Sequence, residues 1–121
     1  MSSEVERILR KIQNLVCIDN SYRLSKHVIY DYLYQDKCTY EDIIYCIQNA
    51  NTINGISEDQ MGTATDGRLY TIIGENEAGI DFYTTGKFIK NRENEEIYFF
   101  VTAHEMEEEE WVYSIINVKN A

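Results

Sequence analysis

The sequence predicts an α+β fold in a single domain of residues 1–121. Apolar residues recur at helical spacing over residues 3–48. β-Branched and aromatic residues dominate residues 68–104, which polar clusters divide at 74–79 and 90–96. We therefore expect N-terminal helices, a three- to four-stranded antiparallel meander and a C-terminal helix.

Three helices are expected in the N-terminal half, and each has its own start signal. Ser2 and Ser3 offer an N-cap for the first helix. Ser25 can cap the second, KHVIYDYLYQ, and Thr39 with Asp42 makes the capping pair of the third. Each helix is expected to pack through an apolar stripe: Val5, Ile8, Leu9, Ile12 and Val16; Val28, Ile29, Tyr32 and Leu33; and Tyr40, Ile43, Ile44 and Ile47.

The central segment is expected to form three strands joined by short turns. Gly74 and Gly79 fit the first turn, the stretch NREN fits the second, and Gly86 marks a bulge in the middle strand. The segment CIDNSYR before the second helix is expected to be irregular, and residues 51–66 to be a loop or a poorly paired strand. After Thr102, glutamates suit the first turn of the last helix, because carboxylates favour the positive end of the helix dipole.

The net charge of −10 is the most informative property of the composition. Eight glutamates and no Lys or Arg lie between Glu93 and Glu110. Tight binding of bulk RNA or DNA needs a basic patch that displaces counterions from phosphates, so direct nucleic-acid binding is disfavoured. The excess acid is either an ordinary solvated surface or a face that binds a basic partner protein. The candidate binding residues are Glu105, Glu107, Glu108, Glu109 and Glu110.

The apolar, cysteine and histidine patterns limit the remaining classes. The first residues contain no apolar stretch typical of a secretory signal, and no run approaches the roughly 18 apolar residues of a membrane span. We therefore expect a cytoplasmic protein without a membrane partner. Cys17, Cys38 and Cys46 lack CxxC spacing and are expected to be reduced core or near-core thiols. With two histidines and no cysteine cluster, we expect no metal and no cofactor.

The order of several short motifs resembles a known family. Lys26-His27 lies near the start of a helix, TYED follows, GRLYTIIGENEAG spans 67–79, and VTAHEMEEEEWVY spans 101–113. Over about residues 22–113 this order is similar to the BrnT-like small toxins of RelE type and their related uncharacterised domains, which are often found beside antitoxin genes. The resemblance implies a RelE-like fold and, for the better-known relatives, a ribonuclease toxin that a partner antitoxin neutralises.

The sequence departs from the family pattern where relatives carry positive charge. Relatives typically have a basic residue where His104 stands and further Arg or Lys along the last helix, where this chain has Glu107 to Glu110. A metal-independent ribonuclease needs a proton acceptor, a proton donor and cations for the developing phosphorane charge. Because few of those cations remain, we expect an interaction protein: a toxin-derived regulator, inhibitor or decoy whose partner is an antitoxin or a nucleic-acid-binding protein with a basic surface. The alternatives are an active endoribonuclease toxin and a domain whose partner is unrelated to toxins.

Three residues are candidates for catalysis under the endoribonuclease alternative. His27 could donate or accept a proton, with a neighbouring Lys or Arg holding phosphate, or it could be an ordinary histidine on a first helical turn. Arg68 could hold a phosphate or simply pair with a nearby aspartate. His104 lies where the last strand is expected to meet the last helix, and the glutamates beside it would repel an RNA backbone.

The ten tyrosines suggest one more surface. Tyr30, Tyr32, Tyr34, Tyr40 and Tyr45 fall on the second and third expected helices, so some of them must face solvent. Exposed tyrosines without nearby cations favour contact with protein over stacking on nucleic-acid bases. The other interpretation is that these side chains edge the core and keep their hydroxyls in water.

Overall fold

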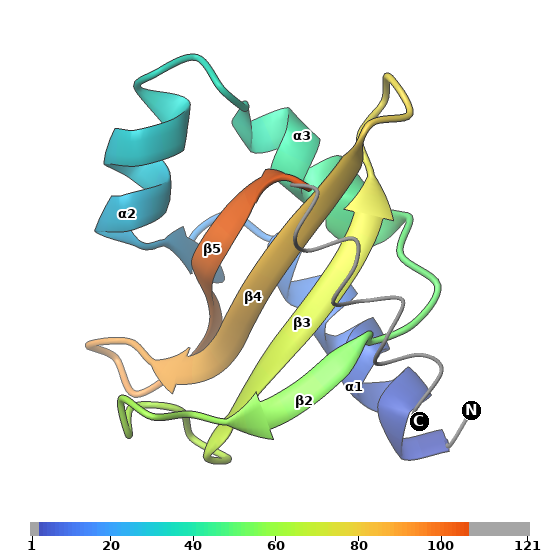
Figure 1. The fold of residues 1–121 in the computed structure, drawn as a ribbon. Helices are drawn as coiled ribbons and strands as arrows, with labels where there is room; N and C mark the ends of the chain where they lie inside the picture. The colour runs from blue at the N-terminus through green and yellow to red at the C-terminus, as the bar shows by residue number, and fades with distance from the viewer. Residues whose placement is uncertain (1–2, 107–121) are drawn as a thin grey trace.

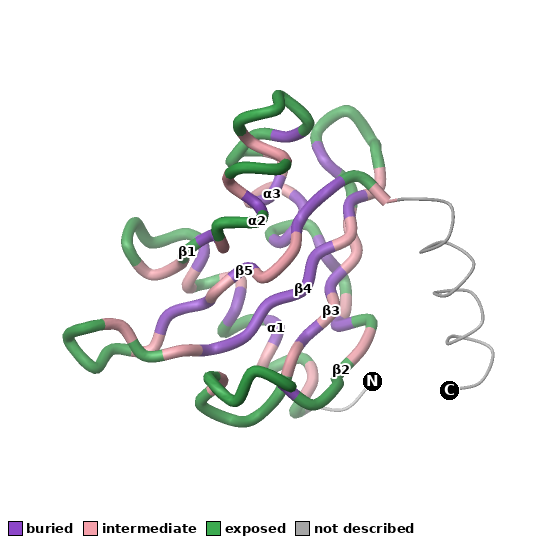
Figure 2. Tube along the Cα trace, turned by 60° about the vertical axis from the view of Figure 1, so that its left-hand side comes forward, coloured by how far each residue is buried: buried purple, intermediate pink, exposed green. Residues whose placement is uncertain are grey.

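The computed structural model describes residues 3–106 and has an α+β architecture. Its strands form one five-stranded mixed sheet, and α1 and α3 cover one face of that sheet (Figure 1). Buried residues concentrate along the three long central strands (Figure 2). The helices are α1 (Ser3–Val16), α2 (Lys26–Val28) with its continuation η1 (Ile29–Leu33), and α3 (Tyr40–Gln48); the strands are β1 (Tyr22–Leu24), β2 (Gly55–Glu58), β3 (Arg68–Glu75), β4 (Asp81–Lys90) and β5 (Glu96–Glu105).

The strand order is β1-β5-β4-β3-β2. β2, β3, β4 and β5 pair with one another antiparallel, whereas β1 runs parallel to β5 with Tyr22 opposite Tyr98 and Leu24 opposite Phe100. The expected antiparallel meander is confirmed for β3 to β5. The expected sheet of three to four strands is wrong in strand number, and it lacks the parallel strand β1. The segment expected to be irregular supplies β1, and residues 51–66 contain the edge strand β2. A three-residue strand is too short to show a period-two pattern, so no local signal marks β1.

The core lies between the sheet and the helices α1 and α3. The predicted capping of α3 is confirmed, because the Thr39 hydroxyl accepts from the Asp42 N–H and the Asp42 carboxylate accepts from the Thr39 N–H. A glycine lets α3 approach the sheet closely: a Cβ at Gly74 would lie 2.6 Å from the carbonyl oxygen of Cys46. The apolar stripes of these two helices are confirmed at the buried Leu9, Ile12, Val16, Ile43 and Ile47 and the half-buried Val5, Ile8 and Ile44, and are wrong at the exposed Tyr40.

The second helix begins where the sequence predicts and then changes its hydrogen-bond pattern. The Ser25 hydroxyl caps it by accepting from the Val28 N–H. After one turn the chain widens into the π-helix η1, in which the Tyr34 N–H donates to the Ile29 carbonyl at 2.9 Å. π-Helical turns are rare and frequently lie at functional sites. Val28 is buried as expected, and Ile29, Tyr32 and Leu33 are half-buried.

The ladder between β4 and β5 shifts register at Gly86, as the sequence predicts. Thr85 pairs with Thr102 and Gly86 pairs with Phe100, so the extra residue is Val101 of β5. The irregularity expected at Gly86 is confirmed, and the residue that bulges belongs to the neighbouring strand.

The ring of Tyr98 lies directly against Gly86. A Cβ at this position would lie 2.3 Å from the Tyr98 hydroxyl oxygen and 2.4 Å from its Cζ. The rings of Phe88 and Phe100 contact the same tyrosine edge to face, with centroids 5.6 Å and 5.1 Å away. Within residues 3–106, the Tyr98 hydroxyl is the buried side-chain polar atom that lacks a hydrogen-bond partner. Because glycine has no side chain, the Tyr98 ring can occupy the space beside Gly86.

β5 continues further than the sequence suggests. His104 lies opposite Tyr83 and Glu105 opposite Phe82, so the strand remains paired with β4 to its last residue. The expected start of a helix directly after Thr102 is therefore wrong, because pairing with β4 overrides the local preference of the glutamates. The rest of the expected C-terminal helix lies outside the described residues.

An ion pair is buried beside the sheet. The Lys87 Nζ of β4 lies 3.1 Å from the Asp59 Oδ1, and their side chains are only 5% and 3% exposed. The Asp59 carboxylate also accepts from the N–H groups of Met61, Thr63 and Ala64. One carboxylate therefore ties the loop between β2 and β3 to the middle of the sheet.

Candidate functional site

Two of the three predicted catalytic residues lie in one cluster of rings. The exposed His27 of α2 has its Nδ1 2.6 Å from the Asp31 Oδ2. The His104 of β5 is buried, with its Nδ1 2.7 Å from the Glu105 carbonyl oxygen. The Tyr32 ring separates them: its centroid lies 5.3 Å from that of His27, edge to face, and 5.0 Å from that of His104, stacked. The structure thus brings both histidines of the chain to the same aromatic residue.

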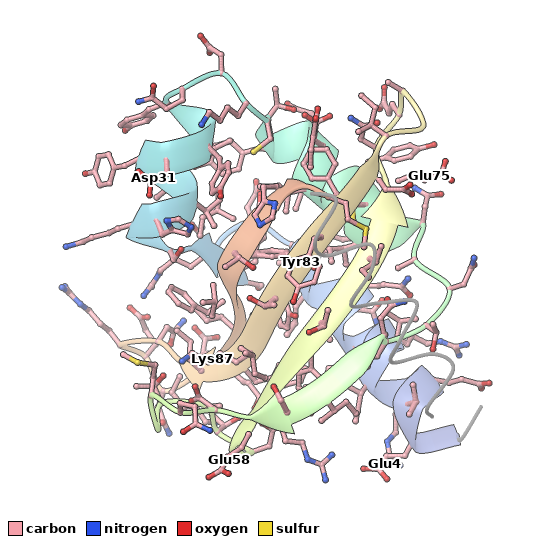
Figure 3. The ribbon with its side chains drawn as sticks, in the orientation of Figure 1. Glu4, Asp31, Glu58, Glu75, Tyr83 and Lys87 are labelled. Atoms are coloured by element: carbon pink, nitrogen blue, oxygen red, sulfur yellow. The ribbon has the colours of Figure 1, made fainter. Side chains whose placement is uncertain are left out.

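Arg68 lies far from these histidines. Its Nη1 is 3.4 Å from the Glu4 Oε1 at the N-terminal end of α1. His104 pairs with Tyr83, which in turn pairs with Ile73, five residues along β3 from Arg68. At about 3.3 Å per residue, that separation is roughly 16 Å along the strand. In Figure 3, Asp31, which contacts His27, and Glu4, which contacts Arg68, lie on opposite sides of the molecule. The three candidates therefore do not form one site.

A different cation lies near the histidines. The Lys37 Nζ is 5.8 Å from the centroid of the Tyr32 ring. Sequence reasoning missed both Lys37 and the central position of Tyr32, because the π-helical turn and the length of β5 decide which residues meet there. Lys37 is exposed, like His27, so both are accessible to solvent.

The predicted acidic binding residues are only partly described. Glu105 is exposed at the end of β5. Glu107, Glu108, Glu109 and Glu110 lie outside the described residues.

A second feature of the surface is a groove along the open side of β1. One hollow lies between β1, η1 and the start of α3, and another continues along α3. Both are lined by Tyr22 and Tyr40, and we call the two adjoining hollows together the tyrosine groove. Its aromatic and acidic lining residues are Tyr22, Tyr40 and Tyr45 and Asp19, Glu41 and Glu77.

The lining of the tyrosine groove contains more acidic than basic side chains. Burial raises the pKa of the Tyr22 phenol, and the charges of Asp19 and Glu41 raise it further. Arg23 is the one cation among the described residues that line the groove. Tyrosine rings next to carboxylates bind Lys and Arg side chains, because the ring faces and the carboxylates both attract cations. The groove is thus suited to a basic ligand.

The cysteines carry no reactive site in the core. Burial raises the pKa of the Cys38 thiol to about 11 and that of Cys46 to about 12, so both remain protonated at neutral pH. All three cysteines are free, as expected, but Cys17 is exposed rather than near the core. Among residues 3–106, no group of three or more His, Cys, Asp or Glu side chains is arranged to hold a metal ion.

Comparison with protein families, curated proteins and solved structures adds no relative. The chain matches no family model, no curated protein and no solved structure. In the described part of the chain, no helix is both long enough and apolar enough to cross a membrane. The features that bear on function are the tyrosine groove and the histidine cluster, which consists of His27, Tyr32 and His104.

Proposed function

We propose that the chain is a protein-binding module whose tyrosine groove holds a basic segment of its partner. The observation that supports this function is the meeting of three tyrosines and three carboxylates in one groove: Tyr22, Tyr40, Tyr45, Asp19, Glu41 and Glu77. The resemblance to BrnT-like and RelE-type toxins extends the proposal to a toxin-derived regulator, inhibitor or decoy. Its partner is then an antitoxin or a protein that otherwise binds nucleic acid.

Aromatic and electrostatic contacts have separate tasks in such a complex. Tyrosines supply large contact area for little loss of side-chain entropy and are enriched among the residues that dominate binding energy. Tyr40 is 49% exposed, so its ring is available to a partner. The carboxylates accelerate encounter with a basic protein and exclude acidic ones. Nucleic acid carries the same sign of charge as the groove and is repelled.

Charge reversal in the groove tests this function. A triple variant with Asp19→Lys, Glu41→Lys and Glu77→Lys is expected to bind a basic partner at least about tenfold more weakly, because the attraction becomes repulsion. The measurement is capture from host lysate with a tagged chain, quantification of the retained basic proteins by mass spectrometry, and titration of the purified partner.

A matched control separates the groove from the net charge. The triple variant Glu6→Lys, Glu58→Lys and Glu93→Lys has the same net charge but alters exposed carboxylates outside the groove. This control is expected to retain most of the affinity. Equal capture by both triple variants would contradict the proposal.

The histidine cluster supports a second candidate function, metal-independent cleavage of RNA. Exposed His27 is a candidate proton donor or acceptor, and Lys37 is a candidate cation for the phosphate. If the chain cleaves RNA, His27→Ala is expected to lower the rate by roughly 10²- to 10⁴-fold. Arg68→Ala is expected to leave that rate unchanged, because Arg68 lies at the end of β3 that is far from both histidines.

The nuclease candidate is tested by incubating purified chain with RNA and following the size of the products. His27→Ala and Arg68→Ala are compared with the wild-type chain at the same concentration. Intact RNA in the presence of wild-type chain eliminates this candidate and leaves the binding function.

A further inference from the structure

We propose that the partner segment binds as an extended strand added to the open edge of β1, with Lys or Arg at alternate positions. This inference rests on the proposed binding function and specifies the form of the ligand. A strand that adds to a sheet edge gains main-chain hydrogen bonds, and pockets for alternate side chains give it specificity.

The backbone of β1 has a free set of hydrogen-bonding groups on the groove side. Pairing with β5 uses the Ser21 carbonyl, which accepts from Tyr98, and the Ser25 N–H, which donates to Phe100. In a parallel ladder, the N–H and C=O groups of the residues between these points alternate in direction. The N–H and C=O groups of Tyr22 and Leu24 therefore point away from β5, toward the open edge of the sheet.

One of the hollows that make up the tyrosine groove is lined by all three residues of β1. Ile29 of η1 and Tyr40 of α3 line the same hollow as Tyr22, Arg23 and Leu24. An edge strand leaves unpaired N–H and C=O groups that another chain can pair with. Because β1 has only three residues, Tyr22 and Leu24 are the two that present such groups. Here the neighbouring helices leave a groove beside the strand.

The side chains of β1 specify an alternating ligand. Leu24 is buried on the helix-covered face of the sheet, and Tyr22 contacts Phe100 on that same face with ring centroids 6.3 Å apart. Arg23 is exposed on the opposite face. Side chains of the added strand alternate in the same way, so every second one lies beside Tyr22, Asp19 and Glu41. These positions favour Lys or Arg, and the positions beside Arg23 disfavour them.

The test uses synthetic peptides that share one sequence and differ only in backbone donors. The parent probe is an eight-residue capped peptide of alternating Lys and Thr. In one derivative the Lys amides are N-methylated, and in the other the Thr amides are N-methylated. An added strand directs the amides of only one set toward β1, and which set depends on whether it runs antiparallel or parallel.

Strand addition predicts how tightly each peptide binds and which amides of β1 are protected from hydrogen exchange. The parent peptide is expected to bind, one N-methylated derivative to lose at least about tenfold in affinity, and the other to retain it. At saturating parent peptide, hydrogen exchange of the Tyr22 and Leu24 amides is expected to slow at least about tenfold. Absence of parent binding, equal affinity of the two derivatives, or unchanged exchange at both amides would overturn the inference.

A pair of protein variants tests the hydrogen bond that the Tyr22 N–H is proposed to donate to the peptide. Tyr22→Pro removes the outward N–H and leaves the bonds to β5, as proline is tolerated on an edge strand. Tyr22→Val removes the ring and keeps the N–H. The proline variant is expected to bind the parent peptide at least about fivefold more weakly than the valine variant. Equal affinity of two folded variants contradicts strand addition.

The groove triple variant separates this inference from the proposed function. If the two N-methylated peptides bind equally but charge reversal at Asp19, Glu41 and Glu77 still weakens them, strand addition fails and the binding function stands. If charge reversal leaves capture of basic partners unchanged, the proposed function itself fails.

Discussion

Replacing Gly86 with alanine is expected to lower the free energy of unfolding by about 3 kcal/mol. The new methyl group would lie 2.3 Å from the Tyr98 hydroxyl oxygen and 2.4 Å from its Cζ. Tyr98 cannot move aside, because it is fully buried against Phe88 and Phe100. Urea denaturation of the wild-type and variant chains measures the difference.

A double-mutant cycle with Tyr98→Val isolates this steric cause. Valine removes the ring that the new methyl group would meet, so Gly86→Ala should be much less harmful in the Tyr98→Val chain than in the wild type. Tyr98→Phe is a further control: it removes a hydroxyl without a hydrogen-bond partner and is expected to change stability little. Additive effects in the cycle would show that backbone strain rather than the ring opposes alanine.

Replacing Asp59 with alanine is expected to lower the melting temperature by roughly 10 °C. The substitution leaves the 5%-exposed Lys87 ammonium without its carboxylate. It also removes the acceptor for the N–H groups of Met61, Thr63 and Ala64. Thermal unfolding followed by circular dichroism measures the shift. A melting temperature within about 2 °C of wild type would contradict a structural role for the pair.

The same carboxylate predicts how stability depends on acid. The N–H of Ala64, followed by Lys87 and the other loop N–H groups, lowers the pKa of Asp59 from 3.8 to about 2. A group with a lowered pKa in the folded state stabilises that state above its unfolded pKa and loses this effect as pH falls through the folded value. The stability difference between wild type and Asp59→Asn is therefore expected to be constant above about pH 4 and to shrink as the pH falls toward 2.

The elements that the sequence predicts correctly are those with local signals. α3 has a capping box at Thr39 and Asp42, α1 has a long apolar stripe, and β3 to β5 have β-branched and aromatic residues between turn signals. The irregularity near Gly86 could also be predicted from the sequence, because glycine inside a strand often marks a bulge. These features depend on residues close together in the chain, and a single sequence contains that information.

The errors occur where distant segments decide the structure. β1 has only three residues and is a strand because β5 pairs with it. β5 extends to Glu105 because β4 remains beside it, despite glutamates that favour a helix start. In each case, tertiary pairing outweighs a weak local preference.

The candidate site was predictable only in part for the same reason. His27 and His104 were identified by residue type, but Tyr32 brings them together through a π-helical turn that no sequence pattern marks. Arg68 is far from both histidines, because it lies at the start of β3 and His104 lies level with Ile73 near the end of that strand. The tyrosine groove depends on β1, so its outline could not be predicted once that strand was missed.

The parallel pairing of β1 with β5 also determines when the groove forms during folding. Tyr22 pairs with Tyr98, so the two residues are far apart in the sequence. This contact can form only after β5 has left the ribosome. Until β5 is in place, nothing fixes which backbone groups of β1 face outward. A partner that bound by the proposed strand addition would therefore recognise chains in which β1 and β5 have paired, and not nascent ones.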